Sequence, residues 1–344
     1  MTATQLAGID PARLGEWAAQ VAPGARIERI DLITGGKSNL TYRLRGRAGD
    51  EAPLDWVLRR PPLGTLTPSA HDMGREYRVV HALQGSPVPV APSIALGDDT
   101  DVLGVVFAVY GFVAGRSIQS ADEARAMPVA ERAEASLALA TGLAALHQVD
   151  AAAVGLGAFG RPDGFTARQV TRWAGQWERV RTRELPVVAK LADELAARVP
   201  PAQRASILHG DLRLDNAILA PQSPRILAFV DWEMAALGDP LTDLATLLVY
   251  ADRVIEPVLG VPHLDRAGGF PSQRELAAAY ARASGLSLDD LDFYLALAYL
   301  KLAVIAEGIH HRFLAGDTVG EGFATAGAAV EPLLRRAVDH VRGL

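Results

Sequence analysis

The chain has 344 residues, of which 49% are hydrophobic and 22% charged, and its formal net charge is −6. This composition is typical of a globular protein that buries a core, and the length predicts roughly two domains. The mild negative charge argues against nucleic acid or an anionic membrane surface as a partner. Because the sequence contains no cysteine, disulfides, thiolate metal sites and thiol nucleophiles are excluded.

The first third of the sequence predicts a small antiparallel sheet that carries one helix. A first helix is expected over residues 11–21, and the helix of the sheet at about 69–84. Alternating or short apolar runs predict strands at 26–33, 39–46, 55–60, 93–97 and 104–110. A glycine-flanked hinge at 111–115 follows, so residues 1–112 are expected to form a first lobe. The N-terminal residues lack the pattern of a secretory signal, and a cytoplasmic location is expected.

Residues 113–344 are predicted to form a larger, mostly helical lobe. Helical patterns occur at about 136–148, 164–184, 187–198, 240–251, 272–284, 288–312 and 321–342. Ser120–Glu123 and Ser272–Glu275 have the form of capping boxes. The most apolar run is interrupted by Lys301 and falls short of the ~20 apolar residues that cross a membrane. The predicted class is therefore α+β with two lobes, and the ligand site is expected between them.

The stretch ILHGDLRLDNAIL, residues 207–219, places an unusually polar loop between two short apolar strands. Its polar side chains are those of His209, Asp211, Arg213, Asp215 and Asn216. A hairpin turn requires fewer polar residues, although Asp and Asn often bond to their own loop backbone. Phosphoryl transfer offers a functional reason, because it needs a carboxylate that accepts a proton and oxygen ligands for Mg²⁺.

HGDLRLDN (209–216) followed by VDWEMAALGDPLTDLA (230–245) resembles the aminoglycoside phosphotransferase family. GGKSNLTYRL, WVLRRPP and LAALHQVD are similar to one branch, the kinase-type domain of acyl-CoA dehydrogenase family members 10 and 11. The resemblance covers residues 30–315, approximately, and implies a bilobal protein-kinase-like fold. It implies transfer of the γ-phosphoryl group of ATP or GTP, with Asp211 as catalytic base. Asn216 and Asp231 would bind Mg²⁺.

The same resemblance implies roles for residues around this centre. His209 would brace the loop, and Asp243 would hold it in place. The turn over the nucleotide phosphates would comprise Gly35, Gly36, Lys37, Ser38 and Asn39. Taken alone, a Gly-Gly pair between strands also fits a plain hairpin. The hinge residues Tyr110 and Phe112 would receive the nucleotide base through backbone groups.

Arg59 departs from the protein-kinase pattern, because it stands where kinases have a lysine that contacts the α- and β-phosphates. It is expected to bind phosphate and to pair with Glu76, and Arg60 is the alternative if the register shifts by one residue. An exposed salt bridge worth ~0–1 kcal/mol is the plain structural explanation. The departure also leaves open a nucleotide-binding regulatory module, a pseudokinase without transferase activity. A metal hydrolase is disfavoured, because no HExxH-like pattern occurs.

Several further residues have ordinary explanations beside functional ones. Asp239 is expected to cap the helix that begins at Pro240. His310 and His311 are expected at a solvated helix end. Glu233 is a candidate for contact with metal-bound water, and Arg168 and Trp173 for the border of the acceptor pocket, where Trp173 equally fits a core position.

The acceptor is expected to be a small molecule with a hydroxyl group. The narrower branch suggests a hydroxyacyl-CoA or a related hydroxy acid. No stretch of the sequence is densely acidic, which argues against an aminoglycoside.

Overall fold

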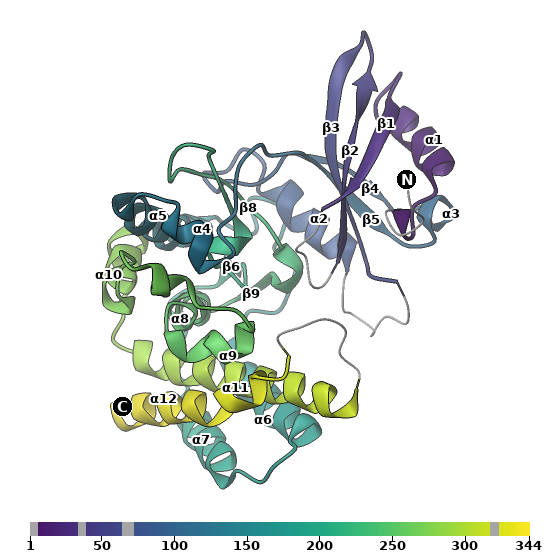
Figure 1. Cartoon of the computed structure of the whole chain (residues 1–344). Helices are drawn as coiled ribbons and strands as arrows, with labels where there is room; N and C mark the ends of the chain where they lie inside the picture. The colour runs from purple at the N-terminus through teal and green to yellow at the C-terminus, as the bar shows by residue number, and fades with distance from the viewer. Residues whose placement is uncertain (1–5, 34–38, 64–71, 317–322) are drawn as a thin grey trace. The chain divides into compact units, whose positions relative to one another are not determined.

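A computed structural model describes residues 6–33, 39–63, 72–316 and 323–344 of the chain. The chain divides into two compact units (Figure 1). Unit 1 comprises Met1–Ala114 and Leu227–Ala235, and unit 2 comprises Gly115–Ile226 and Ala236–Leu344.

The segment Leu227–Ala235 belongs to unit 1, whereas the sequence placed everything after residue 112 in one helical lobe. The reason is local pairing. The Phe229 N–H donates to the Pro89 carbonyl at 2.8 Å, and Phe229 forms a parallel bridge with Val90. A segment far along the chain therefore completes unit 1.

Unit 1 contains a five-stranded antiparallel sheet with the strand order β1-β2-β3-β5-β4. Its strands are β1 (Arg26–Leu32), β2 (Leu40–Ala48), β3 (Ala52–Arg60), β4 (Ser93–Gly97) and β5 (Phe107–Gly111). Its helices are α1 (Pro11–Val21), α2 (Met73–Ala82) and the short α3 (Thr100–Leu103). The predicted order of three strands, a helix and two strands is confirmed.

The two faces of this sheet carry different side chains, because successive residues of a strand point to opposite sides. Tyr42 on β2 and Leu58 on β3 are paired and fully buried. Helix α1 covers this face, where the Trp17 ring meets Phe107 edge to face at 4.8 Å. The sheet therefore packs against α1, the first helix expected at residues 11–21, in addition to the predicted helix α2. An apolar sheet face needs a cover, which α1 supplies.

Unit 2 is mostly helical. Its helices are α4 (Ala121–Arg125), α5 (Val129–Gln148), α6 (Phe165–Val180), α7 (Pro186–Ala197), α8 (Pro240–Tyr250), α9 (Glu256–Leu259), α10 (Gln273–Ser284), α11 (Leu291–Ala315) and α12 (Val330–Arg342). Both predicted capping boxes are present. With the sheet of unit 1, these helices confirm the α+β class.

Short strands frame the polar loop. Strand β6 (Ser206–Leu208) pairs antiparallel with β9 (Ala236–Gly238), and β7 (Ala217–Leu219) follows the loop. Strand β8 (Ile226–Phe229) crosses the boundary between the units. The sequence ILAFVDWE (226–233) predicts a strand that runs four residues further.

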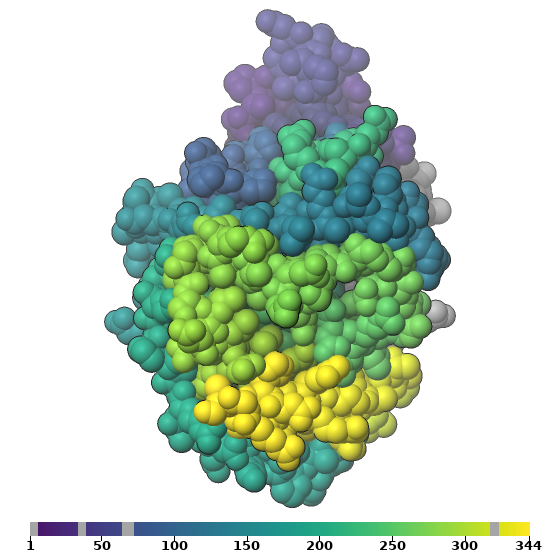
Figure 2. All heavy atoms as spheres, turned by 90° about the vertical axis from the view of Figure 1, so that its left-hand side faces the viewer, coloured from purple at the N-terminus to yellow at the C-terminus, as the bar shows by residue number. Residues whose placement is uncertain are grey.

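Helix α11 is the core helix of unit 2 and packs against α6, α8 and α12. Its length and composition would allow it to cross a membrane. However, 78% of its most apolar 18-residue stretch is buried inside the protein, as in a core helix. Helix α12 lies on the surface of unit 2 (Figure 2) and turns an apolar face, which includes Leu333 and Leu334, toward the interior.

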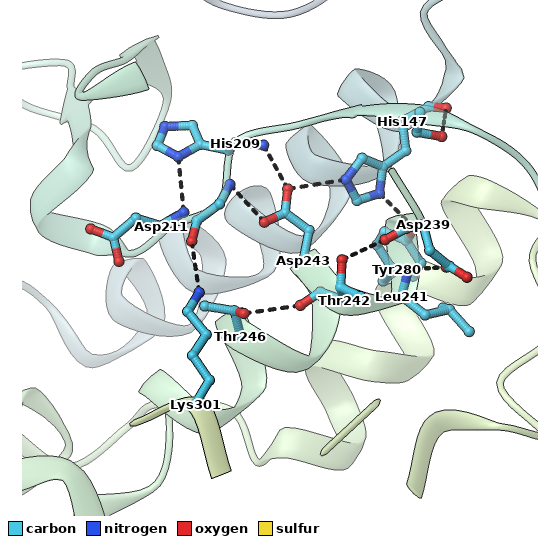
Figure 3. Close-up of polar contacts among 12 residues, drawn as sticks. His147, His209, Asp211, Asp239, Leu241, Thr242, Asp243, Thr246, Tyr280 and Lys301 are labelled. Atoms are coloured by element: carbon cyan, nitrogen blue, oxygen red, sulfur yellow. Dashed lines mark hydrogen bonds and ion pairs between the residues drawn. The ribbon is translucent and has the colours of Figure 1, made fainter. Parts of the chain in front are cut away.

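The loop between β6 and β7 is held by the first turn of α8. Gly210 has a φ of +84°, which glycine adopts without strain. The N–H groups of His209 and Gly210 donate to the two carboxylate oxygens of Asp243, at 2.7 Å and 2.8 Å (Figure 3). Asp243 therefore fixes the backbone immediately before Asp211.

Asp243 is itself held by His147, at the end of α5. His147 Nε2 lies 3.3 Å from Asp243 Oδ2, and His147 Nδ1 lies 2.7 Å from the Tyr280 hydroxyl (Figure 3). Burial acts to raise the pKa of Asp243, but the hydrogen bonds from His147 and the loop backbone outweigh it, so the pKa lies below its usual value. Asp243 is therefore a carboxylate at neutral pH, as two N–H donors require.

We expect Asp243→Asn to lower the free energy of unfolding by about 2–4 kcal/mol, because an amide cannot accept from both loop N–H groups through two oxygens. Chemical denaturation at neutral pH measures this change, with Asp193→Asn on the exposed side of α7 as the matched control. Because the pKa of Asp243 is lowered on folding, the difference should shrink as the pH falls through that value. Equal stability of the two variants at neutral pH would contradict this role.

Candidate active site

Asp211 lies in the polar loop of unit 2, and both of its carboxylate oxygens accept hydrogen bonds. The Tyr250 hydroxyl donates to Oδ1, and Asn216 Nδ2 donates to Oδ2 at 3.1 Å. The Asp211 N–H faces His209 Nδ1 at 3.4 Å, which is the predicted bracing contact (Figure 3). The loop therefore presents Asp211 in one orientation.

Asn216 uses its amide nitrogen twice on Asp211. Besides the bond to the side chain, Nδ2 donates to the Asp211 backbone carbonyl at 2.8 Å. The amide oxygen therefore points away from Asp211 and can serve a cation. Carboxamide oxygens are ligands that Mg²⁺ accepts.

Tyr250, the last residue of α8, was not identified from the sequence. It lies seven residues after Asp243, so the two side chains share one face of α8. Burial, and then the charge of Asp211, raise the pKa of Tyr250 well above its usual value, so its hydroxyl stays a donor. The helical spacing from Asp243 was the available signal. The apolar run TLLVY is typical of a buried helix, however, and it does not distinguish Tyr250 from a core residue.

In unit 1, Arg59 on β3 lies between two carboxylates. Its Nε is 3.2 Å from Glu76 Oε1, and its terminal nitrogen donates to Asp231 Oδ1 at 2.8 Å. Arg60 points to the other face of the sheet, where it donates to the carbonyls of Gly8 and Pro61. The structure therefore brings Arg59, rather than Arg60, together with Glu76.

The carboxylate of Glu76 is 2% exposed, and the Tyr110 hydroxyl approaches it at 3.4 Å. Burial raises the pKa of Glu76 to about 7 even though Arg59 opposes the rise, because Asp231 and Glu233 add negative charge. For Arg59 the two carboxylates outweigh burial and raise the pKa, so the guanidinium stays charged. In unit 1, Arg59 thus pairs with two carboxylates, and the charge of Glu233 acts on one of them, Glu76.

Asp231 has a left-handed backbone conformation, with φ 67° and ψ 61°. Residues other than glycine rarely adopt it, and such strain costs about 1–3 kcal/mol and concentrates at functional sites. The strand therefore ends before Asp231 and not at it. Two residues later, Glu233 accepts a hydrogen bond from Asn39 Nδ2 at 3.1 Å.

The predicted nucleotide turn and hinge are only partly within the described residues. Gly35, Gly36, Lys37 and Ser38 lie outside them. In the hinge, the N–H of Gly111 donates to Pro92 O at 2.7 Å and the N–H of Phe112 to Asp55 O at 3.0 Å. These two N–H groups are therefore used within unit 1, and contact of the hinge with a nucleotide base through its other backbone groups stays a prediction.

Asp239 caps α8, as predicted. Its Oδ1 accepts from the Leu241 N–H at 3.0 Å, and its Oδ2 accepts from the Tyr294 hydroxyl at 2.6 Å.

Among the residues that the structure describes, no three Asp, Glu or His side chains lie close enough to hold a metal ion by themselves. Mg²⁺ needs fewer protein ligands when nucleotide phosphates supply the others, so Asn216 and Asp231 have suitable chemistry for it.

Known proteins share both sequence and fold with this chain. The model of the phosphotransferase enzyme family matches residues 29–297. Acyl-CoA dehydrogenase family member 11 of Gallus gallus is 36% identical over 311 residues, which cover 88% of this chain and 39% of that protein. Member 10 of Mus musculus is 32% identical over 308 residues, covering 88% of this chain and 28% of that protein. The chain therefore spans well under half the length of these relatives.

Solved structures agree. A Ralstonia eutropha protein, provisionally assigned as an aminoglycoside phosphotransferase, has a TM-score of 0.80 and 30% identity over 97% of this chain and 98% of that chain. Macrolide 2′-phosphotransferase type I, with a TM-score of 0.61 and 19% identity over 97% and 98%, shares the fold. Because the family model matches most of its length, the chain belongs to the phosphotransferase enzyme family, as its motifs indicated, and is a phosphotransferase with a kinase-like α+β fold.

Proposed function

We propose that this phosphotransferase transfers the γ-phosphoryl group of ATP or GTP to a hydroxyl group of a small molecule. The observation that carries the proposal is the setting of Asp211, whose two carboxylate oxygens are oriented by Tyr250 and Asn216 on a fixed loop. In phosphoryl transfer the protein mainly positions groups and stabilises charge. Asp211 would accept the proton of the attacking hydroxyl.

Mg²⁺ is the proposed cofactor, and Asn216 and Asp231 are its proposed protein ligands. When bound, Mg²⁺ would neutralise charge on the phosphate oxygens of the nucleotide. Support comes from Asn216, whose amide nitrogen rather than its oxygen bonds to Asp211, and from Glu76 and Glu233, acidic residues of unit 1 as Asp231 is. Arg59 is proposed to contact the phosphates, where its planar fork can bind two oxygens at once.

The second candidate is a nucleotide-binding regulatory module without transferase activity. One contact favours it, because Arg59 already donates to Asp231 Oδ1, on the side chain that should bind the metal. The orientation of Asp211 favours an active enzyme, since a regulatory module has no need of a fixed base.

The acceptor is proposed to be a hydroxyacyl-CoA or a hydroxy acid, in keeping with the names of the acyl-CoA dehydrogenase relatives. An aminoglycoside is the weaker proposal, although the structural neighbour from Ralstonia eutropha carries that provisional assignment.

Asp211→Asn should lower turnover by about 10²–10⁴, the usual contribution of a positioned general base. An amide keeps the size of the side chain but cannot take the proton. A coupled assay of nucleotide turnover with an active acceptor measures the loss, and Asp193→Asn serves as control. Turnover within a few-fold of the parent enzyme would reject Asp211 as the base.

Asp231→Ala should weaken Mg²⁺-dependent nucleotide binding by at least about tenfold, or ~1.4 kcal/mol, because a charged metal ligand is lost. Titration calorimetry with and without Mg²⁺ measures the change, and Asp50→Ala in the exposed turn after β2 is the control. If Mg²⁺ strengthens binding equally in both variants, Asp231 is not a metal ligand and the regulatory module gains support.

A further inference from the structure

Lys301 places an ammonium group beside the catalytic loop. Lys301 belongs to the core helix α11, and its Nζ donates to the carbonyl of Gly210 at 3.3 Å (Figure 3). Gly210 is the residue immediately before Asp211. An ammonium has three N–H donors, and this long bond uses one of them. Within the described part of the chain, Lys301 forms no ion pair with a carboxylate.

Lys301 is half-buried, and withdrawing an ammonium from water is costly, so its presence needs a reason. Burial lowers the pKa of Lys301, and only then do the charges of Asp211 and Asp243 oppose that effect. An apolar side chain would fill the same place without this cost. Structural stability alone therefore does not account for the residue.

The choice of lysine is also unusual in this chain. Only three of its 34 basic residues are lysines, and Lys190 lies exposed on α7. Arginine presents a broad planar fork, whereas lysine presents a compact charge with donors that can turn toward a ligand. A compact cation at position 301 fits a small anionic group close to the base.

Arg172 on α6 supplies a second positive charge, and α6 packs against α11. Its charge adds to the lowering of the Lys301 pKa by burial, but it acts more weakly than the opposing charges of Asp211 and Asp243. The described residues include no carboxylate paired with Arg172, whose guanidinium lies 5.2 Å from the centre of the Trp173 ring. An anionic ligand could bond to the remaining N–H donors of Lys301 and would be attracted by the exposed guanidinium of Arg172.

We propose that Lys301, assisted by Arg172, binds an anionic group of the acceptor and so selects molecules that carry a carboxylate or phosphate in addition to the reacting hydroxyl. This inference rests on the proposed function, because it assigns the acceptor to the site around Asp211. It predicts that a polycationic acceptor is repelled there. The competing explanation is that Lys301 only holds the Gly210 carbonyl and positions the loop.

The test compares Lys301→Met, which keeps the length and removes the charge, with Lys301→Arg, which keeps the charge. Lys190→Met is the matched surface control. Acceptors are short hydroxy acids, their neutral primary amides and the corresponding hydroxyalkyl phosphates, assayed at saturating Mg²⁺ and nucleotide. The amides keep the hydroxyl but lose the charge, and the phosphates distinguish the two kinds of anion.

We expect Lys301→Met to raise the KM of the preferred anionic acceptor by about 10–100-fold, the effect of losing a charged hydrogen bond. The KM of the neutral amide should stay unchanged, and Lys301→Arg should recover part of the preference. An equal fall in kcat for acid and amide, with both KM values unchanged, would overturn anion recognition and leave only a positioning role.

Acceptor binding by calorimetry separates this inference from the proposed function. Loss of anion binding in Lys301→Met, together with no turnover of any acceptor by the parent enzyme, would support the anion site and overturn phosphoryl transfer to these hydroxyls. Binding of acid and amide with equal affinity by the parent enzyme would overturn the anion site, whatever the turnover.

Discussion

The buried carboxylate of Asp243 is the constraint on which the proposed catalytic loop depends. It accepts the N–H groups of His209 and Gly210, and His147 fixes it from the opposite side. A loop with five polar side chains has many local hydrogen-bonding choices, and this carboxylate removes most of them. Asp211 therefore does not depend on substrate binding to find its orientation, which lowers the entropic cost of reaching the reactive geometry.

The charged side chains near the candidate site residues differ between the two units, each considered by itself. In unit 1, Arg59 pairs with Glu76 and Asp231, and the charge of Glu233 also acts on Glu76. Unit 2 places Lys301 next to the loop that carries Asp211. This difference in charge is compatible with a reaction in which a metal–nucleotide complex and an acceptor need different electrostatic surroundings.

Arginine at position 59 forms other bonds than a lysine could form at the same place on β3. A guanidinium can bond to two carboxylates at once, as Arg59 does with Glu76 and Asp231, whereas an ammonium is a point charge. Metal binding at Asp231 would compete with one of these bonds. The arginine would then turn one donor toward phosphate while Glu76 retains the other, so the substitution is compatible with activity.

Much of the fold could be predicted from the sequence because its signals are local. Alternation identified the strands of unit 1, and two capping boxes located helix starts. The roles of His147, Tyr250 and Lys301 could not be predicted, because each acts through a partner distant in the sequence and sits in an apolar helix. The left-handed conformation of Asp231 was missed for a related reason, since the apolar run before it suggested a continuous strand.

The central claim is tested most directly by ³¹P NMR of the parent enzyme with ATP, Mg²⁺ and a hydroxy acid acceptor. The account predicts a new phosphomonoester resonance that grows in step with ADP and requires Mg²⁺. Formation of inorganic phosphate alone, or binding of the nucleotide with no new resonance for any hydroxylated acceptor, would contradict it.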